Sequence, residues 1–237
     1  MHADETTCQV LREKGRTAEQ TSYMWLYTTG SDALTPIVLY DYQPSRKGSC
    51  AQNFLDGFHG LVQCDGYQGY NRLEDVTLVC CLAHARRKFF EAVPAARRKK
   101  LKLLDINSDV AIEDSNLPDE EEAEQLTLMN YLLDGRCEIS NNRAERKAKS
   151  YAIGRKAFLF HTSEAGAGAS AVMYSIVETA KANNLNIFQY LYTVLLYMPD
   201  YMNSSAGIEQ LMPWSDFIKE QCSGLIDVES NVPENRI

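Results

Sequence analysis

The sequence has no apolar run long enough to cross a membrane, and it does not open with a basic region followed by an apolar stretch. A membrane-spanning helix needs about 18 or more predominantly apolar residues with few or no charges. A secretory signal needs a basic segment followed by an apolar one. We therefore expect a cytoplasmic protein with no membrane partner.

The seven cysteines are an odd set and lack any C-x-x-C spacing. Both facts argue against a disulfide framework and against a zinc ribbon, so we expect reduced thiols. Cys80, Cys81 and His84 suggest a zinc site by proximity. However, adjacent residues of a strand point to opposite faces, and no second ligand pair follows, so we do not predict zinc there. We favour packing or phosphate contact for His84.

Positive charge is in deficit, because 24 Lys and Arg face 32 Asp and Glu and give a net charge of −8. A nucleic-acid partner requires cations that neutralise phosphates. The charge is unevenly spread, since many acids lie at 113–124 whereas basic residues gather in two blocks, from Arg86 to Lys102 and from Arg143 to Lys156. Each block is either a solvated helix face or a DNA-binding surface.

The apolar patterns alternate between strand and helix periods, which favours an α/β fold. β-rich runs predict strands at 1–11, 22–28 and 36–42, one ending at Asp65, and another at 76–82. Helical spacing predicts helices at 49–58, 83–93, 171–182 and 187–198, and one that follows Asn142. Residues 153–160 and 163–170 read as a basic turn and a small-residue loop. We expect the first three strands to form an antiparallel meander.

Asp65 lies where a buried strand gives way to a glycine turn. Gly66 can adopt the positive φ of such a turn, and the ends of strands are where open α/β sheets place ligand chemistry. A plain Asp-Gly turn is the alternative. Glu145 follows Asn142 by three residues, so it is either a functional acid or a capping-box glutamate.

Acids on the first strand (Asp4), after the fourth (Asp65) and on a late helix (Glu145) have the layout of a ribonuclease-H-like metal site. Two divalent cations about 3.5–4 Å apart can promote phosphoryl transfer, and Mg²⁺ prefers carboxylate ligands. Glu5 is the rival to Asp4, because only one of two adjacent strand residues can point toward Asp65.

Motifs along nearly the whole chain resemble the catalytic part of the IS66-family transposases. They are His2-Ala-Asp-Glu-Thr6, Leu39-Tyr-Asp-Tyr-Gln-Pro-Ser-Arg46, Gln63-Cys-Asp-Gly-Tyr-Gln-Gly-Tyr70, Ala83-His-Ala-Arg-Arg-Lys-Phe89, Asp134-Gly135, Ser140-Asn-Asn-Arg-Ala-Glu-Arg146, Gly154-Arg-Lys156 and Leu211-Met-Pro-Trp214. The resemblance implies a DDE triad of Asp4, Asp65 and Glu145. It further implies two Mg²⁺ ions, with Mn²⁺ as a substitute, and DNA cleavage and strand transfer at insertion-sequence ends.

The implied fold is a ribonuclease-H-like mixed sheet flanked by helices, with a helical C-terminal extension. The implied partners are DNA and further copies of the chain. We expect the DNA contacts to come from His84, Arg86, Arg87, Lys88, Asn142, Arg143, Arg146, Arg155 and Lys156.

We expect five segments: the first part of the core at 1–93, an insertion at 94–127, the rest of the core at 128–160, the extension at 161–221 and a flexible tail at 222–237. Members of this family also carry N-terminal recognition regions and a longer insertion, so we expect a truncated chain with impaired transposition. The alternatives are an inactive remnant that binds DNA non-specifically and a metal-dependent nuclease of the same fold.

Overall fold

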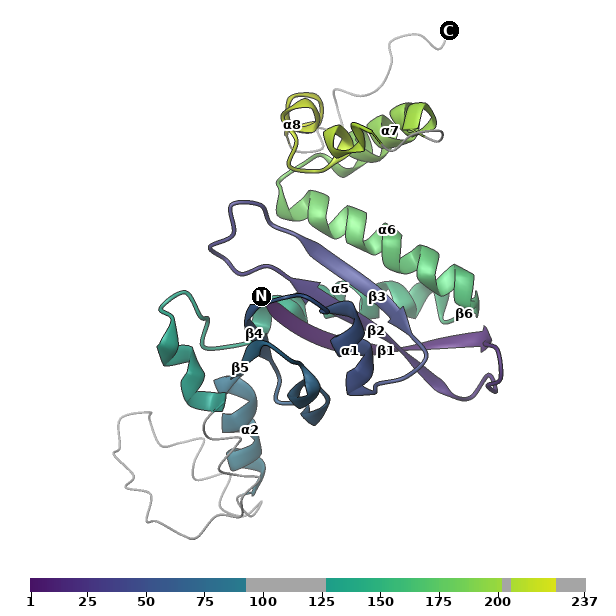
Figure 1. Ribbon diagram of the computed structural model, residues 1–237. Coiled ribbons are helices and arrows are strands. Elements are labelled where there is room, and N and C mark those ends of the chain that lie inside the picture. Colours follow the sequence, from purple (N-terminus) through teal and green to yellow (C-terminus); the bar gives the residue numbers. More distant parts are fainter. Residues whose placement is uncertain (93–126, 202–205, 225–237) are drawn as a thin grey trace, which may run out of the picture.

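The structure, a computed structural model, describes residues 1–92, 127–201 and 206–224 (Figure 1). The insertion expected at 94–127 therefore lies almost wholly outside the described residues, as does most of the tail expected at 222–237. Within the described part, no helix is both long and apolar enough to cross a membrane. All seven cysteines are described, and each is a free thiol.

A mixed sheet forms the centre of the molecule, with strand order β3-β2-β1-β4-β5. The strands are β1 (His2–Arg12), β2 (Thr21–Thr28), β3 (Val38–Gln43), β4 (Gly60–Cys64) and β5 (Val76–Cys80). The first three are antiparallel, whereas β4 runs parallel to β1 and β5 runs parallel to β4. The α/β class and the antiparallel meander are thus confirmed. A short strand that was not predicted, β6 (His161–Ser163), pairs with the far end of β1.

Helices cover both faces of this sheet (Figure 1). One face carries α1 (Gly48–Phe54) and the 3₁₀ turn η1 (Gln68–Arg72), and the other carries α5 (Asn142–Phe158) and α6 (Glu164–Ala182). Helix α2 (Leu82–Ala92) follows β5, and the turn η2 (Asn130–Leu133) contacts β5.

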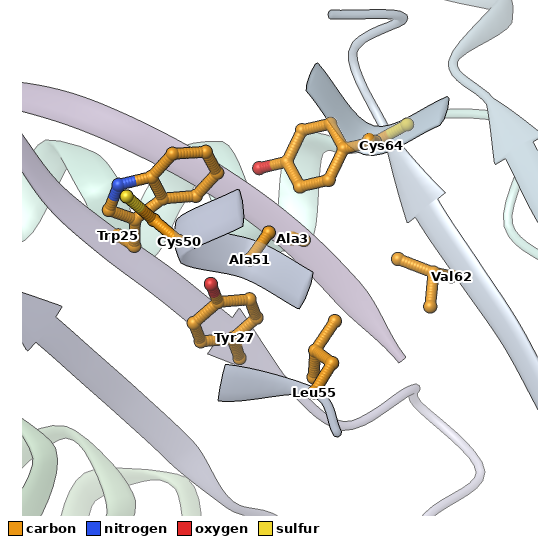
Figure 2. Packing of buried hydrophobic residues seen from close by; sticks show 9 residues of the cluster. Ala3, Trp25, Tyr27, Cys50, Ala51, Leu55, Val62 and Cys64 are labelled. Carbon is orange, nitrogen blue, oxygen red and sulfur yellow. The ribbon is translucent and has the colours of Figure 1, made fainter. Parts of the chain in front are cut away.

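Side chains of β2 show why the sheet is covered on both faces. Trp25 and Tyr27 pack toward α1, as Figure 2 shows, whereas Met24 and Leu26 pack toward α5 and α6. All four are almost completely buried. Burial of a large apolar side chain is worth about 1.5–3 kcal/mol, so the period-2 pattern of β2 stabilises both layers at once.

Two predicted irregular segments are helical. Residues 153–158 continue α5 instead of forming a turn, and α6 begins at Glu164 instead of after a loop. Gly154 of α5 packs closely against α6, since a Cβ there would lie 1.9 Å from the Tyr174 hydroxyl, whereas a Cβ on Gly166 or Gly168 would meet nothing closer than 3.5 Å. Ser163 caps α6 by accepting a hydrogen bond from the Gly166 N–H. The helix is held by its buried alanines, Ala167 and Ala171.

The C-terminal part is helical, as expected for the extension. It comprises α7 (Ile187–Tyr197), the turns η3 (Met198–Tyr201) and η4 (Ile208–Leu211), and α8 (Asp216–Cys222). These helices share a small core with the end of α6, built around Ala180, Tyr190 and Ile218. In Figure 1 they lie at the end of α6, away from β4 and β5.

Candidate active site

Asp4 and Asp65 occupy matching places on two neighbouring strands. His2 of β1 is paired with Gln63 of the parallel strand β4, and two residues further along each chain come Asp4 and Asp65. β4 ends at Cys64, and Gly66 has φ +86°, so the predicted strand end and glycine turn are confirmed. One oxygen of Asp65 accepts a hydrogen bond from the Tyr67 N–H at 2.9 Å. This contact orients the carboxylate and leaves its second oxygen for a ligand.

Glu5 points to the opposite face of β1, where burial raises the pKa of its carboxyl more than the contacts from Tyr70 and Arg46 lower it. Its carboxylate accepts hydrogen bonds from Arg46 Nε at 2.6 Å and from the Tyr70 hydroxyl at 2.7 Å. The side chain is only 2% exposed. Asp4, by strand alternation, lies on the side of α5. The charge of Asp65 acts on both Asp4 and Glu5, so the difference between them is that Glu5 is already bound by Arg46 and Tyr70.

Asn141 ties the start of α5 to β1. Its side chain donates to the Ala3 carbonyl at 2.8 Å and lies 3.2 Å from His2 Nδ1. It is fully buried, and its own carbonyl accepts the N–H of Glu145. Glu145 therefore lies one helical turn after Asn141, and Asn141 is hydrogen-bonded to β1, the strand that carries Asp4.

The capping-box alternative for Glu145 is wrong in this geometry. The N-cap of α5 is Asn141, one residue earlier than that alternative requires, and its side chain makes no capping hydrogen bond. A capping box needs the acid three residues after the cap, and Ala144 occupies that position. Glu145 is thus not explained by helix capping.

The electrostatics of Asp4 link it to the other two acids. Burial raises the pKa of Asp4 to about 7; the hydrogen bond from the Glu5 N–H opposes this, and the charges of Glu5, Asp65 and Glu145 raise the pKa further. A bound cation would relieve a carboxylate whose ionisation is disfavoured by burial and by neighbouring acids.

Cys81 and His84 also lie beside Glu145. His84 Nδ1 is 3.6 Å from Glu145 Oε1, and the potential ligand atoms of Cys81, His84 and Glu145 all lie within 4.8 Å of one another. Among the described residues, these three form a group of potential metal ligands whose ligand atoms all lie within 4.8 Å of one another. Asp4, Asp65 and Glu145 do not form such a group. A pair of cations 3.5–4 Å apart needs ligands spread more widely than a single cation does.

Comparison with known proteins identifies the family. The family model described as Transposase IS66 family matches residues 1–127 and 114–169, and the one described as IS66 C-terminal element matches residues 175–214. The chain belongs to the IS66 family of transposases. The resemblance noted in the sequence motifs is therefore confirmed, and all three candidate acids fall inside the matched segments.

Three uncharacterized Sinorhizobium fredii proteins are similar to this IS66-family chain. y4qI and y4jD are each 27% identical, covering 90% and 76% of this chain but 50% and 46% of their own lengths. y4hP is 25% identical and covers 90% of this chain and 50% of its own length. The chain thus spans about half the length of these relatives. No solved structure matches it at a significant level.

The basic candidates of this IS66-family chain fall into two groups. Arg86, Arg87 and Lys88 are exposed on α2, and Asn142 and Arg146 are exposed on the first turns of α5. These five lie on the same helices as His84 and Glu145. Arg143 is half-buried, and its Nε donates to Glu138 Oε1 at 2.9 Å.

Arg155 and Lys156 are placed differently from the expectation. They were expected in a turn next to the site, but they lie in the last turn of α5. At 1.5 Å per residue, Arg155 is about 15 Å from Glu145 along the helix. Arg155 donates to the carbonyl and hydroxyl of Thr7, so it joins the end of α5 to β1.

The run Ser140-Asn-Asn142 predicts a helix start, and Asn141 is the N-cap of α5, but sequence reasoning missed that the Asn141 side chain bonds β1 instead of capping the helix. Asn141→Ala should destabilise the IS66-family fold by about 2–4 kcal/mol, because two buried hydrogen-bonding groups lose their partner. Urea unfolding monitored by circular dichroism measures the change. Asn142→Ala, at the exposed neighbour, is the matched control and should shift the midpoint little. Equal effects of the two variants would contradict the role given to Asn141.

Proposed function

We propose that this chain is the catalytic region of a DDE transposase with a ribonuclease-H-like fold, which cleaves DNA and transfers strands at insertion-sequence ends. Family membership and the mixed sheet flanked by helices support the proposal. The observation that carries it is that burial raises the pKa of Asp4 to about 7 and that the charges of Asp65 and Glu145, which come from two other parts of the fold, raise it further.

The three acids suit Mg²⁺. Their donors are carboxylate oxygens, which are the ligands that Mg²⁺ prefers, and the raised pKa of Asp4 marks a place where added positive charge is favourable. Asp4, Asp65 and Glu145 would hold two Mg²⁺ ions, or Mn²⁺ as a substitute. When bound, such ions activate the attacking oxygen and stabilise the leaving oxygen of an in-line phosphoryl transfer.

The remaining residues hold the acids in place. Asn141 fixes the start of α5 against β1, and the Tyr67 N–H orients Asp65. Arg46 and Tyr70 keep Glu5 on the opposite face, so that β1 presents a single acid toward α5. Pre-set side chains of this kind reduce the reorganisation needed when the reaction begins.

DNA would approach along α2 and the start of α5. His84, Arg86, Arg87, Lys88, Asn142 and Arg146 provide donors for phosphate groups there. Arg143 would add to this surface if it exchanged Glu138 for a phosphate. Strand transfer joins two ends, so the active complex would contain at least two copies of the chain.

The alignment with y4qI supports a shortened insertion. It runs over 272 residues, more than the 237 of this chain, so y4qI carries residues within the aligned region that this chain lacks. The family model also matches as two segments that meet around 114–127. We propose that the missing residues belong to the insertion between α2 and α5, and that paired-end transfer suffers more than nicking.

The test uses purified protein and a supercoiled plasmid that carries the terminal inverted repeats of the element. The proposal expects nicking in Mg²⁺ or Mn²⁺ and none in EDTA. A second assay supplies a duplex with a free 3′-hydroxyl end and measures its joining to target DNA. Nicking without joining would reassign the chain as a metal-dependent nuclease, and loss of both would make it an inactive remnant.

DNA affinity should fall steeply with salt and depend little on sequence. The four exposed cations near the site, Arg86, Arg87, Lys88 and Arg146, would neutralise about four phosphates and release their counterions, which gives a slope of about −3.6 in log K against log salt. Arg146→Ala should lower the magnitude of this slope by about 1. Lys219→Ala, on α8, is the control and should leave it unchanged. Fluorescence anisotropy with matched and scrambled end duplexes measures both quantities, and a clear preference for the matched end would refute the prediction.

A further inference from the structure

Three side chains of different chemistry converge between β5 and the helices that follow it. Cys81 comes directly after β5, and His84 is in the first turn of α2, where its N–H donates to the Cys81 carbonyl at 3.1 Å. Glu145 reaches the same place from α5, with Oε1 at 3.6 Å from His84 Nδ1. The ligand atoms of the three residues lie within 4.8 Å of one another.

Sulfur, nitrogen and oxygen donors together match Zn²⁺. Zinc takes thiolate at about 2.3 Å and imidazole or carboxylate at about 2.0–2.2 Å in a tetrahedral arrangement, which sets the donor atoms about 3–4 Å apart. The three atoms are near that spacing already. Mg²⁺ is a poor match, because it prefers oxygen ligands in an octahedral arrangement.

Two further contacts suit a metal at this position. His84 Nδ1 is buried and makes no hydrogen bond within the described part of the chain; its nearest acceptor is Glu145 Oε1 at 3.6 Å, so a cation between the two atoms would bind both. Cys81 Sγ accepts the Asn141 N–H at 3.1 Å, which is the kind of outer contact that supports a thiolate ligand. Cys81 itself is 1% exposed, and His84 and Glu145, at 22% and 35%, give access from solvent.

We propose that Cys81, His84 and Glu145 form a Zn²⁺ site, and that zinc bound there takes Glu145 away from the Mg²⁺ site. On binding, the Cys81 thiol releases its proton to solvent, and the fourth zinc position is left to water. The zinc site stands on the three residues alone. The inhibition by zinc rests on the proposed function, because it requires Glu145 to serve the cleavage reaction.

Binding is tested with Co²⁺, which replaces Zn²⁺ and gives a thiolate-to-metal charge-transfer band when cysteine coordinates it. The metal-free, reduced chain of 237 residues should bind one Co²⁺ with this band, and Zn²⁺ should displace it. Cys81→Ser should remove the band, and His84→Ala or Glu145→Gln should weaken binding by at least about 10-fold. Cys137→Ser, outside the cluster, should change neither. An undiminished band in Cys81→Ser would overturn the zinc site.

Inhibition is tested in the nicking assay at constant Mg²⁺, with each protein compared to its own activity without zinc. Wild type should be inhibited, and Cys81→Ser, which keeps the three acids, should need at least about 10-fold more Zn²⁺ for half inhibition. Equal sensitivity of the two proteins would overturn the inhibitory role. A wild type that never nicks would contradict the proposed function, while the Co²⁺ titration would still decide the zinc site.

Discussion

Mg²⁺-dependent nicking should fall by at least about a thousandfold in Asp65→Asn and in Glu145→Gln. Each change replaces a charged carboxylate by an amide of nearly the same volume, so it removes metal-ligand charge without opening a cavity. A metal cation supplies several kcal/mol of transition-state stabilisation, and each 1.4 kcal/mol or so is tenfold in rate. The rate of conversion of supercoiled to nicked plasmid measures the loss.

Two matched variants separate a site effect from a general effect of losing an acid. Asp56→Asn and Glu209→Gln alter exposed carboxylates outside the candidate site and should retain wild-type nicking. Circular dichroism and urea unfolding should show all four variants folded. If Asp65→Asn or Glu145→Gln nicks as well as its control, the assignment of that acid is wrong.

Much of the sheet could be predicted, because local pattern and tertiary packing agree there. The runs that contain Trp25 and Val38 are rich in β-branched and aromatic residues, and they form strands that are buried on at least one face. The beginning of α6 could not be predicted in the same way. Its glycines, Gly166 and Gly168, weaken helix propensity, and the sequence does not show that Ala167 and Ala171 of the same small-residue run are buried where α6 packs against the sheet.

The site was predictable only in part for a related reason. Strand alternation shows that Asp4 and Glu5 face opposite ways, but it does not show which face receives α5. Arg46 and Tyr70, far away in the sequence, decide that question by binding Glu5. Cys81 likewise becomes a potential ligand only because α5 places Glu145 beside it.

Asp4→Asn should abolish nicking and at the same time make the metal-free protein more stable at pH 8. The pKa of Asp4 is raised from 3.8 to about 7 in the folded protein, by burial first and by neighbouring acids in addition. A raised pKa means that ionisation costs folding free energy. The wild-type protein therefore pays no cost for Asp4 below about pH 4, where the carboxyl is neutral in both states. Its free energy of unfolding falls as the pH rises from about 4 to 7 and stays at the lower value above pH 7.

An amide at position 4 cannot ionise, so this pH-dependent loss disappears. About three pKa units correspond to at most about 4 kcal/mol, and partial solvent access reduces this, so we expect a gain of about 2–4 kcal/mol at pH 8. Near pH 4 the gain should vanish, because Asp4 is then neutral in the folded protein. Urea unfolding at several pH values in EDTA measures the difference.

Glu5→Gln, one residue along the same strand, is the matched comparison. Burial also raises the pKa of Glu5, although Tyr70 and Arg46 lower it. Glu5→Gln therefore removes a cost of ionisation but also loses charge-assisted hydrogen bonds, and it should gain less stability at pH 8 than Asp4→Asn. Mg²⁺ provides an independent readout, since a cation that binds only the folded protein raises its stability. Wild type and Glu5→Gln should both gain stability from Mg²⁺, and Asp4→Asn should gain much less. If Glu5→Gln rather than Asp4→Asn loses the Mg²⁺ effect, the ligand role passes from Asp4 to Glu5.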